Sequence, residues 1–295
     1  MNFLIQKIKD THSLISNINF KKHIKKNIIK LIIFSLLSTA CQDVIDVNLK
    51  TTKPRLVIDA DIHWENGTSG RNQTIKLSLT APYFNNTVPP ATGATIRISN
   101  SSNTIFNFIE EDNSGIYKND SFIPAIGELY NLNILYDNET YISQETMISV
   151  SPIEFVEQKN NGGFSGEEIE IKAFYTDPEN IDNFYLFDFI DLEKNTSSLE
   201  VYDDVFIDGN QIFAFYTNEN LESGNELLIR SSGISERTFN FFNILLQQTD
   251  EDSGDPFQTQ PATVRGNCVN ETNPDNFPLG YFRVSESDVF SYTIK

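Results

Sequence analysis

Apolar and polar side chains alternate along many short stretches of this chain, and this period of two constrains the fold more than any other feature. Between residues 56 and 64 every second side chain is apolar, and similar runs follow at 75–79, 96–98, 105–109, 129–136 and 141–150. Because successive side chains of a β-strand point to opposite faces, the pattern predicts strands with one buried face. Clusters of Gly, Pro, Asn, Asp and Ser separate the runs, for example at residues 89–93 and 112–115. Residues 53–151 are therefore predicted to form an antiparallel β-sandwich of the Ig-like or prealbumin-like kind.

A second β-rich domain is predicted for residues 152–295. Pro152 marks its start, because proline interrupts a strand ladder and restricts the residue before it. Candidate strands lie at 168–175, 184–190, 199–207, 211–216 and 226–231. The segment near 235–249 has apolar residues at a spacing of three to four after Ser235, which predicts one capped α-helix. The expected fold class is mainly β: an N-terminal sandwich followed by a second β-rich domain with one helix.

Composition supports a globular protein that carries a strongly acidic surface. The chain is 39% hydrophobic and contains 23 Phe and 11 Tyr, enough large side chains for a buried core. This composition excludes a disordered tail and a multi-span membrane protein. Residues 41–295 have a net charge of about −25, because 15 basic residues face 40 acidic ones. Such a surface repels phosphate backbones, so nucleic acid is excluded as a partner.

The first 40 residues have the features of a secretory signal peptide. Five lysines between residues 21 and 30 precede the apolar run 31–37, and three small residues then lead to Cys41. The run is about half as long as a membrane-spanning helix requires. A cysteine in this position resembles a bacterial lipoprotein signal, which implies cleavage before Cys41 and acylation of its thiol and amino group. Residues 41–52 would then form a tether, whereas an ordinary secreted protein with an incidental Cys41 is the alternative.

The second cysteine, Cys268, is predicted to be a buried and unreactive thiol. Two cysteines are too few to indicate a disulfide framework, and acylation of Cys41 would leave Cys268 without a disulfide partner. A free cysteine of this kind is more often a small core residue than a reactive group. A disulfide between the two cysteines in an oxidising compartment is the alternative.

Catalytic constellations are hard to build from these residues. Beyond residue 40 the chain has one histidine, His63, so a multi-histidine metal site cannot form and Ser-His-Asp catalysis would depend on this side chain alone. We expect His63 to face outward on a polar strand face shared with Asp59 and Asp61. Carboxylates are abundant, but none stands out as one half of a glycosidase-like pair.

Calcium is the inorganic ligand that the acidic sequence suggests first, because oxygen ligands suffice for it. Asp250, Asp252 and Asp255 are clustered, but their spacing does not match an EF-hand loop, and a solvated loop is predicted instead. No catalytic residue, resident metal or cofactor is therefore predicted.

Aromatic side chains that reach the surface could bind sugars or peptides. Trp64, Tyr83, Phe84 and Tyr130 are candidates, although large aromatic residues supply most of the burial in a sandwich core. The core interpretation is favoured for all four, and the ligand-binding residues remain unassigned.

Short motifs are spread from the tether to the C-terminal region, at residues 42–47, 56–60, 93–98, 115–117, 264–267 and 279–282. The pair Val-Arg-Gly-Asn at 264–267 and Leu-Gly-Tyr-Phe at 279–282 is the most specific. Together they resemble a lipoprotein family of Bacteroidota that is catalogued as domain of unknown function 4249. The resemblance implies an outer-membrane lipoprotein encoded beside TonB-dependent transporters, and it implies no catalytic residues.

The expected function is that of a non-catalytic accessory or binding component of a TonB-dependent nutrient uptake system. Acylated Cys41 would hold it at the outer membrane, with the cell surface favoured over the periplasmic face because Gln42 and Asp43, directly after the cysteine, resemble a surface-export signal of the Bacteroidota. A structural or adhesive cell-surface β-sandwich protein is the alternative, and an enzyme is the third possibility.

Overall fold

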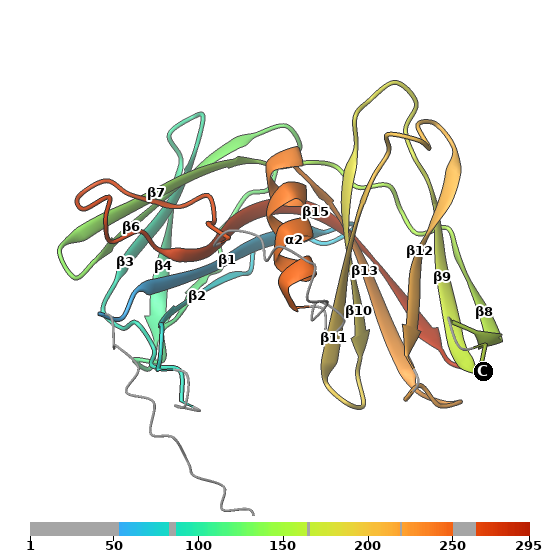
Figure 1. Ribbon diagram of the computed structural model, residues 1–295. Helices are drawn as coiled ribbons and strands as arrows, with labels where there is room; N and C mark the ends of the chain where they lie inside the picture. Colours follow the sequence, from blue (N-terminus) through green and yellow to red (C-terminus); the bar gives the residue numbers. More distant parts are fainter. Residues whose placement is uncertain (1–52, 83–86, 164–165, 219, 250–263) are drawn as a thin grey trace, which may run out of the picture. The chain divides into compact units, whose positions relative to one another are not determined.

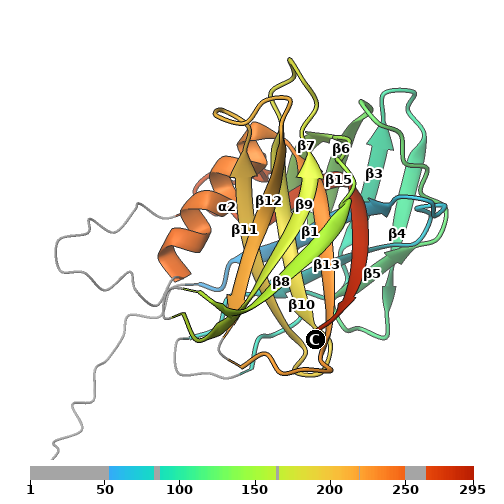
Figure 2. The same ribbon diagram turned by 90° about the vertical axis from the view of Figure 1, so that its right-hand side faces the viewer.

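A computed structural model describes residues 53–82, 87–163, 166–218, 220–249 and 264–295, drawn in Figures 1 and 2. Cys41, the expected tether and the acidic loop at 250–255 lie outside the described residues. Fifteen strands and one helix form within the described part, which confirms the mainly β fold class. No helix among these residues is long and apolar enough to cross a membrane.

The N-terminal strands form an antiparallel array around one apolar core. They are β1 (Leu56–Glu65), β2 (Gln73–Leu79), β3 (Thr95–Asn100), β4 (Ile105–Glu111), β5 (Ile116–Asn119), β6 (Leu129–Tyr136) and β7 (Glu139–Thr146). Their hydrogen-bonded order is β1-β2-β5-β4-β3-β6-β7. Alternate residues of β1 are buried, with Ile58 and Ile62 fully enclosed, as the period of two predicted. We call this core the first core.

The next strands enclose a second core. They are β8 (Phe155–Gly162), β9 (Glu168–Thr176), β10 (Phe184–Asp191), β11 (Thr196–Asp203), β12 (Gln211–Asn218) and β13 (Glu226–Ile234). β12, β9 and β8 form a separate three-stranded sheet, and Tyr175 of β9 meets Phe187 of β10 with ring centroids 5.3 Å apart. Both faces of β10 are largely buried, as its uninterrupted apolar run indicated.

One long C-terminal strand, β15 (Leu279–Thr293), joins the two groups of strands. Its first part pairs in parallel with β1, and its last part pairs antiparallel with β13, so that twelve strands form one sheet. Phe282 accordingly belongs to the first core, whereas Ile294 belongs to the second. The short strand β14 (Val269–Asn270) pairs with β7. Residues 267–286, within the range predicted for the second domain, thus complete the sheet of the first.

The helix α2 (Glu236–Thr249) begins directly after β13, within the segment near 235–249 for which a helix was predicted. Ser235 caps it, because its hydroxyl accepts the Thr238 N–H at 3.3 Å, and Glu236 lies in the first turn. The helix packs against β10 and β11 and keeps most of its apolar residues only half-buried. Its position covers part of one sheet face without sealing it (Figure 1).

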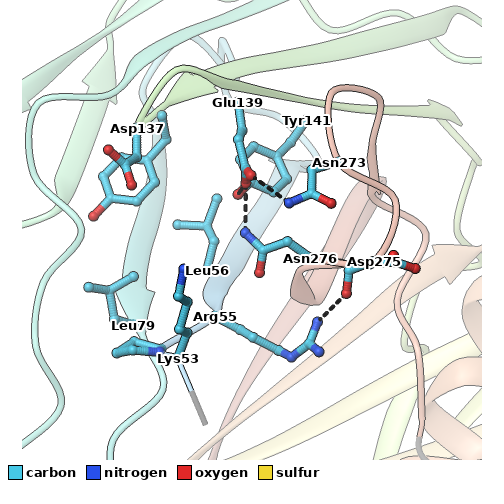
Figure 3. A pocket seen from close by; sticks show the side chains of 12 residues that line it. Lys53, Arg55, Leu56, Leu79, Asp137, Glu139, Tyr141, Asn273, Asp275 and Asn276 are labelled. Atoms are coloured by element: carbon cyan, nitrogen blue, oxygen red, sulfur yellow. Dashed lines mark hydrogen bonds between the residues drawn. The ribbon is translucent and has the colours of Figure 1, made fainter.

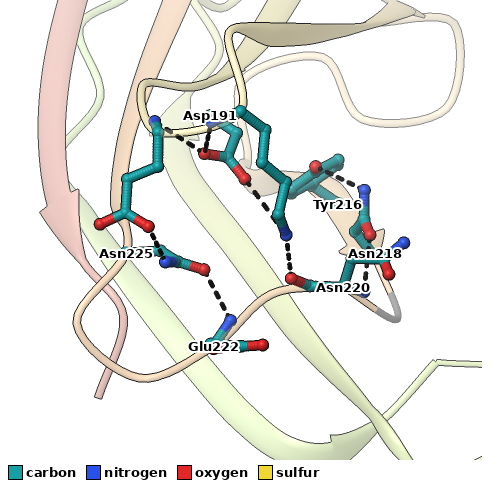
Figure 4. A network of polar contacts seen from close by, with 8 residues as sticks. Asp191, Tyr216, Asn218, Asn220, Glu222 and Asn225 are labelled. Atoms are coloured by element: carbon teal, nitrogen blue, oxygen red, sulfur yellow. Dashed lines mark hydrogen bonds and ion pairs between the residues drawn. The ribbon is translucent and has the colours of Figure 1, made fainter.

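A polar network ties together the two loops that follow β10 and β12 (Figure 4). The buried carboxylate of Asp191 accepts the backbone N–H groups of Glu193 and Lys194, each at 3.0 Å. The side chain of Asn225 donates to Glu193 and accepts the Glu222 N–H at 2.7 Å. Each of these polar groups has a partner within the network. The network therefore holds the two loops together at this end of the second group of strands.

Candidate functional site

A cavity of about 580 Å³ opens near the start of the described chain, between Lys53, Tyr136 and Asn276 (Figure 3). Glu139 dominates it, and its carboxylate accepts hydrogen bonds from the side chains of Tyr141, Asn270, Asn273 and Asn276. Burial alone would raise the pKa of Glu139, but these four donors outweigh it and lower the pKa to about 2. Glu139 is therefore an ionised structural hub and not a proton donor at neutral pH. We call this cavity the Glu139 pocket.

One of the two basic side chains at the rim of the Glu139 pocket, Arg55, is also paired. Arg55 donates to the backbone carbonyls of Asp275 at 3.2 Å and Phe277 at 3.1 Å. Its guanidinium lies 3.9 Å from the ring centroid of Phe277, and that of Arg265 lies 4.0 Å from the same ring. These cation–π contacts and hydrogen bonds hold the Arg55 side chain against the loop before β15.

A second hollow, which we call the α2 groove, lies between α2 and strands β1, β10, β11, β13 and β15 and has a volume of about 360 Å³. Phe241, Phe242 and Leu245 of the helix form its apolar wall. The ring of Tyr281 lies 4.4 Å from that of Phe241 and extends this wall onto the sheet. The remaining lining residues are Val57, Ile58, Asp59, Asp61, Leu186, Asp188, Ser197, Leu199, Arg230, Ser232, Gly280 and Arg283.

Charged residues from neighbouring strands form the floor of the α2 groove. Arg283 binds Asp61 through two parallel hydrogen bonds, from Nε to Oδ1 at 2.9 Å and from Nη2 to Oδ2 at 2.5 Å. Burial would raise the pKa of Asp61, but the charge and hydrogen bonds of Arg283 outweigh it and hold the pKa below its ordinary value. The parallel pairing of β1 with β15 places the two residues directly opposite each other.

Two arginine nitrogen atoms on this floor have no hydrogen-bond partner among the described residues. Nη1 of Arg283 and Nε of Arg230 are both buried and unpaired. The other contact of Arg230 is a long one, with Nη1 at 3.7 Å from Oδ2 of Asp188. Buried donors are nearly always satisfied in folded proteins, so these two unpaired donors are exceptions to the rule.

Asp59 and His63 lie on the same face of β1 as Asp61, as predicted, but this face is not simply open to solvent. Burial and the neighbouring charge of Asp61 raise the pKa of Asp59, whereas Lys76 acts in the opposite direction. Burial also lowers the pKa of His63, although Asp61 opposes the effect, so the imidazole is neutral at pH 7. The polar face of β1 therefore forms the floor of the α2 groove and its immediate surroundings.

Carboxylates whose pKa values are displaced in opposite directions are typical of acid–base catalysis. Asp59 and Asp61 meet that description. Both oxygens of Asp61 are engaged by Arg283, however, which leaves this carboxylate poorly placed to act as a base or nucleophile.

The residues singled out in the sequence are placed as follows. Cys268 is a free thiol, buried as predicted, and burial raises its pKa to about 12. Tyr130 is fully buried, and half-buried Trp64 packs against the first core. Tyr83 and Phe84 lie outside the described residues.

The sequence does not predict the charged floor, because Asp61 and Arg283 are separated by 222 positions. One signal was present in the sequence: Arg283 interrupts an apolar run between Phe282 and Val284. A charge within a run that is otherwise suited to a buried strand calls for a partner.

The two C-terminal motifs meet in space beside the α2 groove. The side-chain amide of Asn267 pairs with the backbone of Phe282, donating to its carbonyl at 2.6 Å and accepting its N–H at 2.8 Å. A Cβ on Gly266 would lie 1.6 Å from the carbonyl oxygen of Gly280, and a Cβ on Gly280 would lie 2.0 Å from that of Ile58. Gly280 also has a φ of +86°. Only glycine allows this approach, so the motifs seat β15 against β1.

The packed sheets define a β-sandwich protein. The chain belongs to the family described as "Domain of unknown function (DUF4249)", whose sequence profile matches residues 42–290. No curated protein matches the chain.

Two solved structures with some similarity are of chicken proteins. A segment of two fibronectin type III domains from chicken tenascin is 10% identical, covers 61% of this chain and 90% of its own length, and has a TM-score of 0.21. The chicken interferon gamma receptor alpha chain is also 10% identical, with coverage of 61% and 88% and a TM-score of 0.20.

Proposed function

We propose that this protein is a lipid-anchored, non-catalytic binding component of a TonB-dependent uptake system at the outer membrane of a member of the Bacteroidota. Its ligand, held in the α2 groove, is a small uncharged molecule that has hydroxyl groups and one apolar face. The observation that carries the proposal is the pair of buried, unpartnered donors on Arg230 and Arg283 beneath an apolar wall.

The chemistry of the α2 groove favours an uncharged ligand over an anion. Arg283 is already neutralised by Asp61, and Arg230 lies near Asp188, so neither arginine of the groove needs an anionic ligand as its counter-ion. The remaining donors can form hydrogen bonds to hydroxyl oxygens, and the carboxylate of Asp59 can accept hydrogen bonds from hydroxyl groups. The Phe242 ring can cover an apolar face of the ligand. The volume of about 360 Å³ lies at the small end of the range for ligand pockets.

The anchor follows from Cys41. Lys53, at the rim of the Glu139 pocket, is twelve positions after Cys41, and twelve extended residues span at most about 40 Å. Acylated Cys41 would therefore keep the sheets close to the membrane, and several acyl chains hold a protein far more firmly than one. The cell surface is the favoured side, where captured cargo could be handed to a transporter.

The groove is tested by ligand binding to the purified full-length chain. We expect a glycan array and calorimetry with its best hits to detect binding, and we expect Phe242→Ala to weaken it at least tenfold. Ile244→Ala is the matched control, because Ile244 is exposed on the same helix and does not line the groove. Equal loss in both variants, or no binding by the wild type, would favour a structural or adhesive surface protein.

The partner is tested separately by a detergent pull-down of C-terminally tagged protein from native membranes. We expect a TonB-dependent transporter to be recovered with the wild type and not with Cys41→Ala. Recovery of lipid and matrix material alone would contradict the accessory role while leaving the groove experiment valid.

A further inference from the structure

Three aspartates gather at one end of the second group of strands, outside both cavities described above. Asp177 directly follows β9, and Asp204 and Asp208 lie in the loop between β11 and β12. One carboxylate oxygen from each lies within 4.8 Å of the corresponding oxygens of the other two. Two separate loops therefore converge on one acidic centre.

The burial of these carboxylates is not balanced by a basic side chain. Asp177 is 2% exposed and Asp204 is 5% exposed, whereas Asp208 reaches the surface. None of the three forms a salt bridge with a lysine, arginine or histidine among the described residues. Buried carboxylates are stable only when paired, hydrogen-bonded or coordinated to a metal.

Hydrogen bonds satisfy part of this requirement. The Tyr185 hydroxyl donates to Asp177 at 2.6 Å, and backbone N–H groups of Gly209, Asn183 and Asn180 donate to Asp177, Asp204 and Asp208. All of these donors are uncharged, and they leave lone pairs free on each carboxylate.

Tyr175 gives an independent indication of a ligand at this centre. Its side chain is fully enclosed, yet its hydroxyl has no hydrogen-bond partner among the residues that the structure describes. Tyr175 and Asp177 are two positions apart and both are buried, so their side chains lie on the same face of the chain. The ring of Tyr175 lies 4.8 Å from that of Tyr185, whose hydroxyl binds Asp177.

We propose that Asp177, Asp204 and Asp208 bind one Ca²⁺ ion, with the Tyr175 hydroxyl holding a water molecule of its shell. Oxygen ligands suit a hard cation, and the absence of histidine and cysteine from the cluster argues against zinc. Ligands at about 2.3–2.6 Å from calcium can lie up to about 5 Å apart on opposite sides of the ion, so oxygens that lie within 4.8 Å of one another can share one calcium ion.

The site differs from the acidic loop at 250–255, which the sequence had suggested, and it does not depend on the α2 groove. The ion would bridge the loop 177–183 and the loop 204–210, and so fix one end of the second group of strands. Calcium should therefore stabilise the second core directly.

The test is calorimetric titration of the chelator-treated full-length chain with CaCl₂, together with terbium luminescence excited through tyrosine. We expect one site with a dissociation constant below about 1 mM, weakened at least tenfold in Asp208→Asn and in Asp204→Asn. Terbium emission should fall in the same variants, because Tyr175 and Tyr185 lie close enough to sensitise it.

Two matched controls separate this site from other acids. Asp182→Asn changes an exposed residue of the same loop, and Asp250→Asn combined with Asp252→Asn and Asp255→Asn removes the acidic loop. We expect both control proteins to bind as the wild type does. Without calcium, the melting temperature of Asp204→Asn should equal or exceed that of the wild type. Added calcium should raise the melting temperature of the wild type and not that of Asp204→Asn. Absence of wild-type binding at 10 mM, or loss only in the acidic-loop variant, would overturn the proposal.

Discussion

The buried tyrosines of the two cores are treated differently by their surroundings. In the first core, Tyr117 and Tyr130 each accept a backbone N–H and donate to a backbone carbonyl. In the second core, Tyr185 donates to the carboxylate of Asp177, and the hydroxyl of Tyr175 has no partner among the described residues. The backbone thus satisfies the hydroxyl groups of Tyr117 and Tyr130, whereas the hydroxyl of Tyr175 can still form a hydrogen bond.

This difference separates tyrosines that fix neighbouring loops from a tyrosine whose hydroxyl has no partner among the described residues. Fully satisfied buried hydroxyls fix loops and add specificity, because any alternative packing would leave them unpaired. Unsatisfied groups cost stability unless something binds them. The cavity on the first group, the Glu139 pocket, likewise has its central charge fully hydrogen-bonded. The α2 groove and the aspartate cluster, by contrast, both draw on strands or loops of the second group.

The largest expected effect tests whether the two cores are independent at all. Phe282→Ala removes a fully buried ring from the first core, and we expect a loss of about 3–5 kcal/mol in the free energy of unfolding. Because β15 also pairs with β13, a single cooperative denaturation curve should shift as a whole. Phe206→Ala, at a residue that is 95% exposed, is the control and should have no effect. A shift confined to one of two separate transitions would show that the cores unfold independently.

A smaller effect addresses the tyrosines directly. Tyr130→Phe leaves a backbone donor and acceptor unpaired, so we expect a loss of about 1–3 kcal/mol in urea denaturation. Tyr175→Phe removes a hydroxyl without a partner among the described residues, and in chelator it should be neutral or slightly stabilising. Equal losses in the two variants would remove the contrast between the cores.

The smallest effect concerns the pH dependence of the first group. The pKa of Glu139 falls from 4.5 to about 2 on folding, so its contribution is complete above pH 4.5 and is lost as the pH falls toward 2. We expect the melting temperature of Glu139→Gln to lie below that of the wild type at pH 6, by an amount equivalent to at most about 1 kcal/mol. The gap should close as the pH approaches 2, and a constant gap would show that the carboxylate charge is not involved.

Local patterns allowed the sequence to predict most of the secondary structure. Alternation located β1 and its buried face, and the three-to-four spacing after Ser235 indicated α2. Both features depend on neighbours within a few residues, which a sequence displays directly.

Features that depend on distant residues could not be predicted in this way. The pairing of β1 with β15 joins residues more than 200 positions apart, and the Asp61–Arg283 pair exists only because of that register. The aspartate cluster is also assembled from two loops, so its members are not adjacent in the sequence. The acids that are adjacent in the sequence, at 250–255, are the ones that a search for a calcium loop finds first. A period of two fixes which face is buried, but it does not identify the strand that lies alongside.

The shared strand β15 has a consequence for how the protein is made. Its partner β1 is the first described strand to leave the ribosome, and β15 is the last of them, so the edge of β1 stays without this neighbour until residues 279–287 have been made. Pairing across such a sequence distance is slow, because loop-closure entropy must be overcome before the contact forms. A chain that stops before residue 279 would expose the edges of β1 and β13 together, a ready template for aggregation.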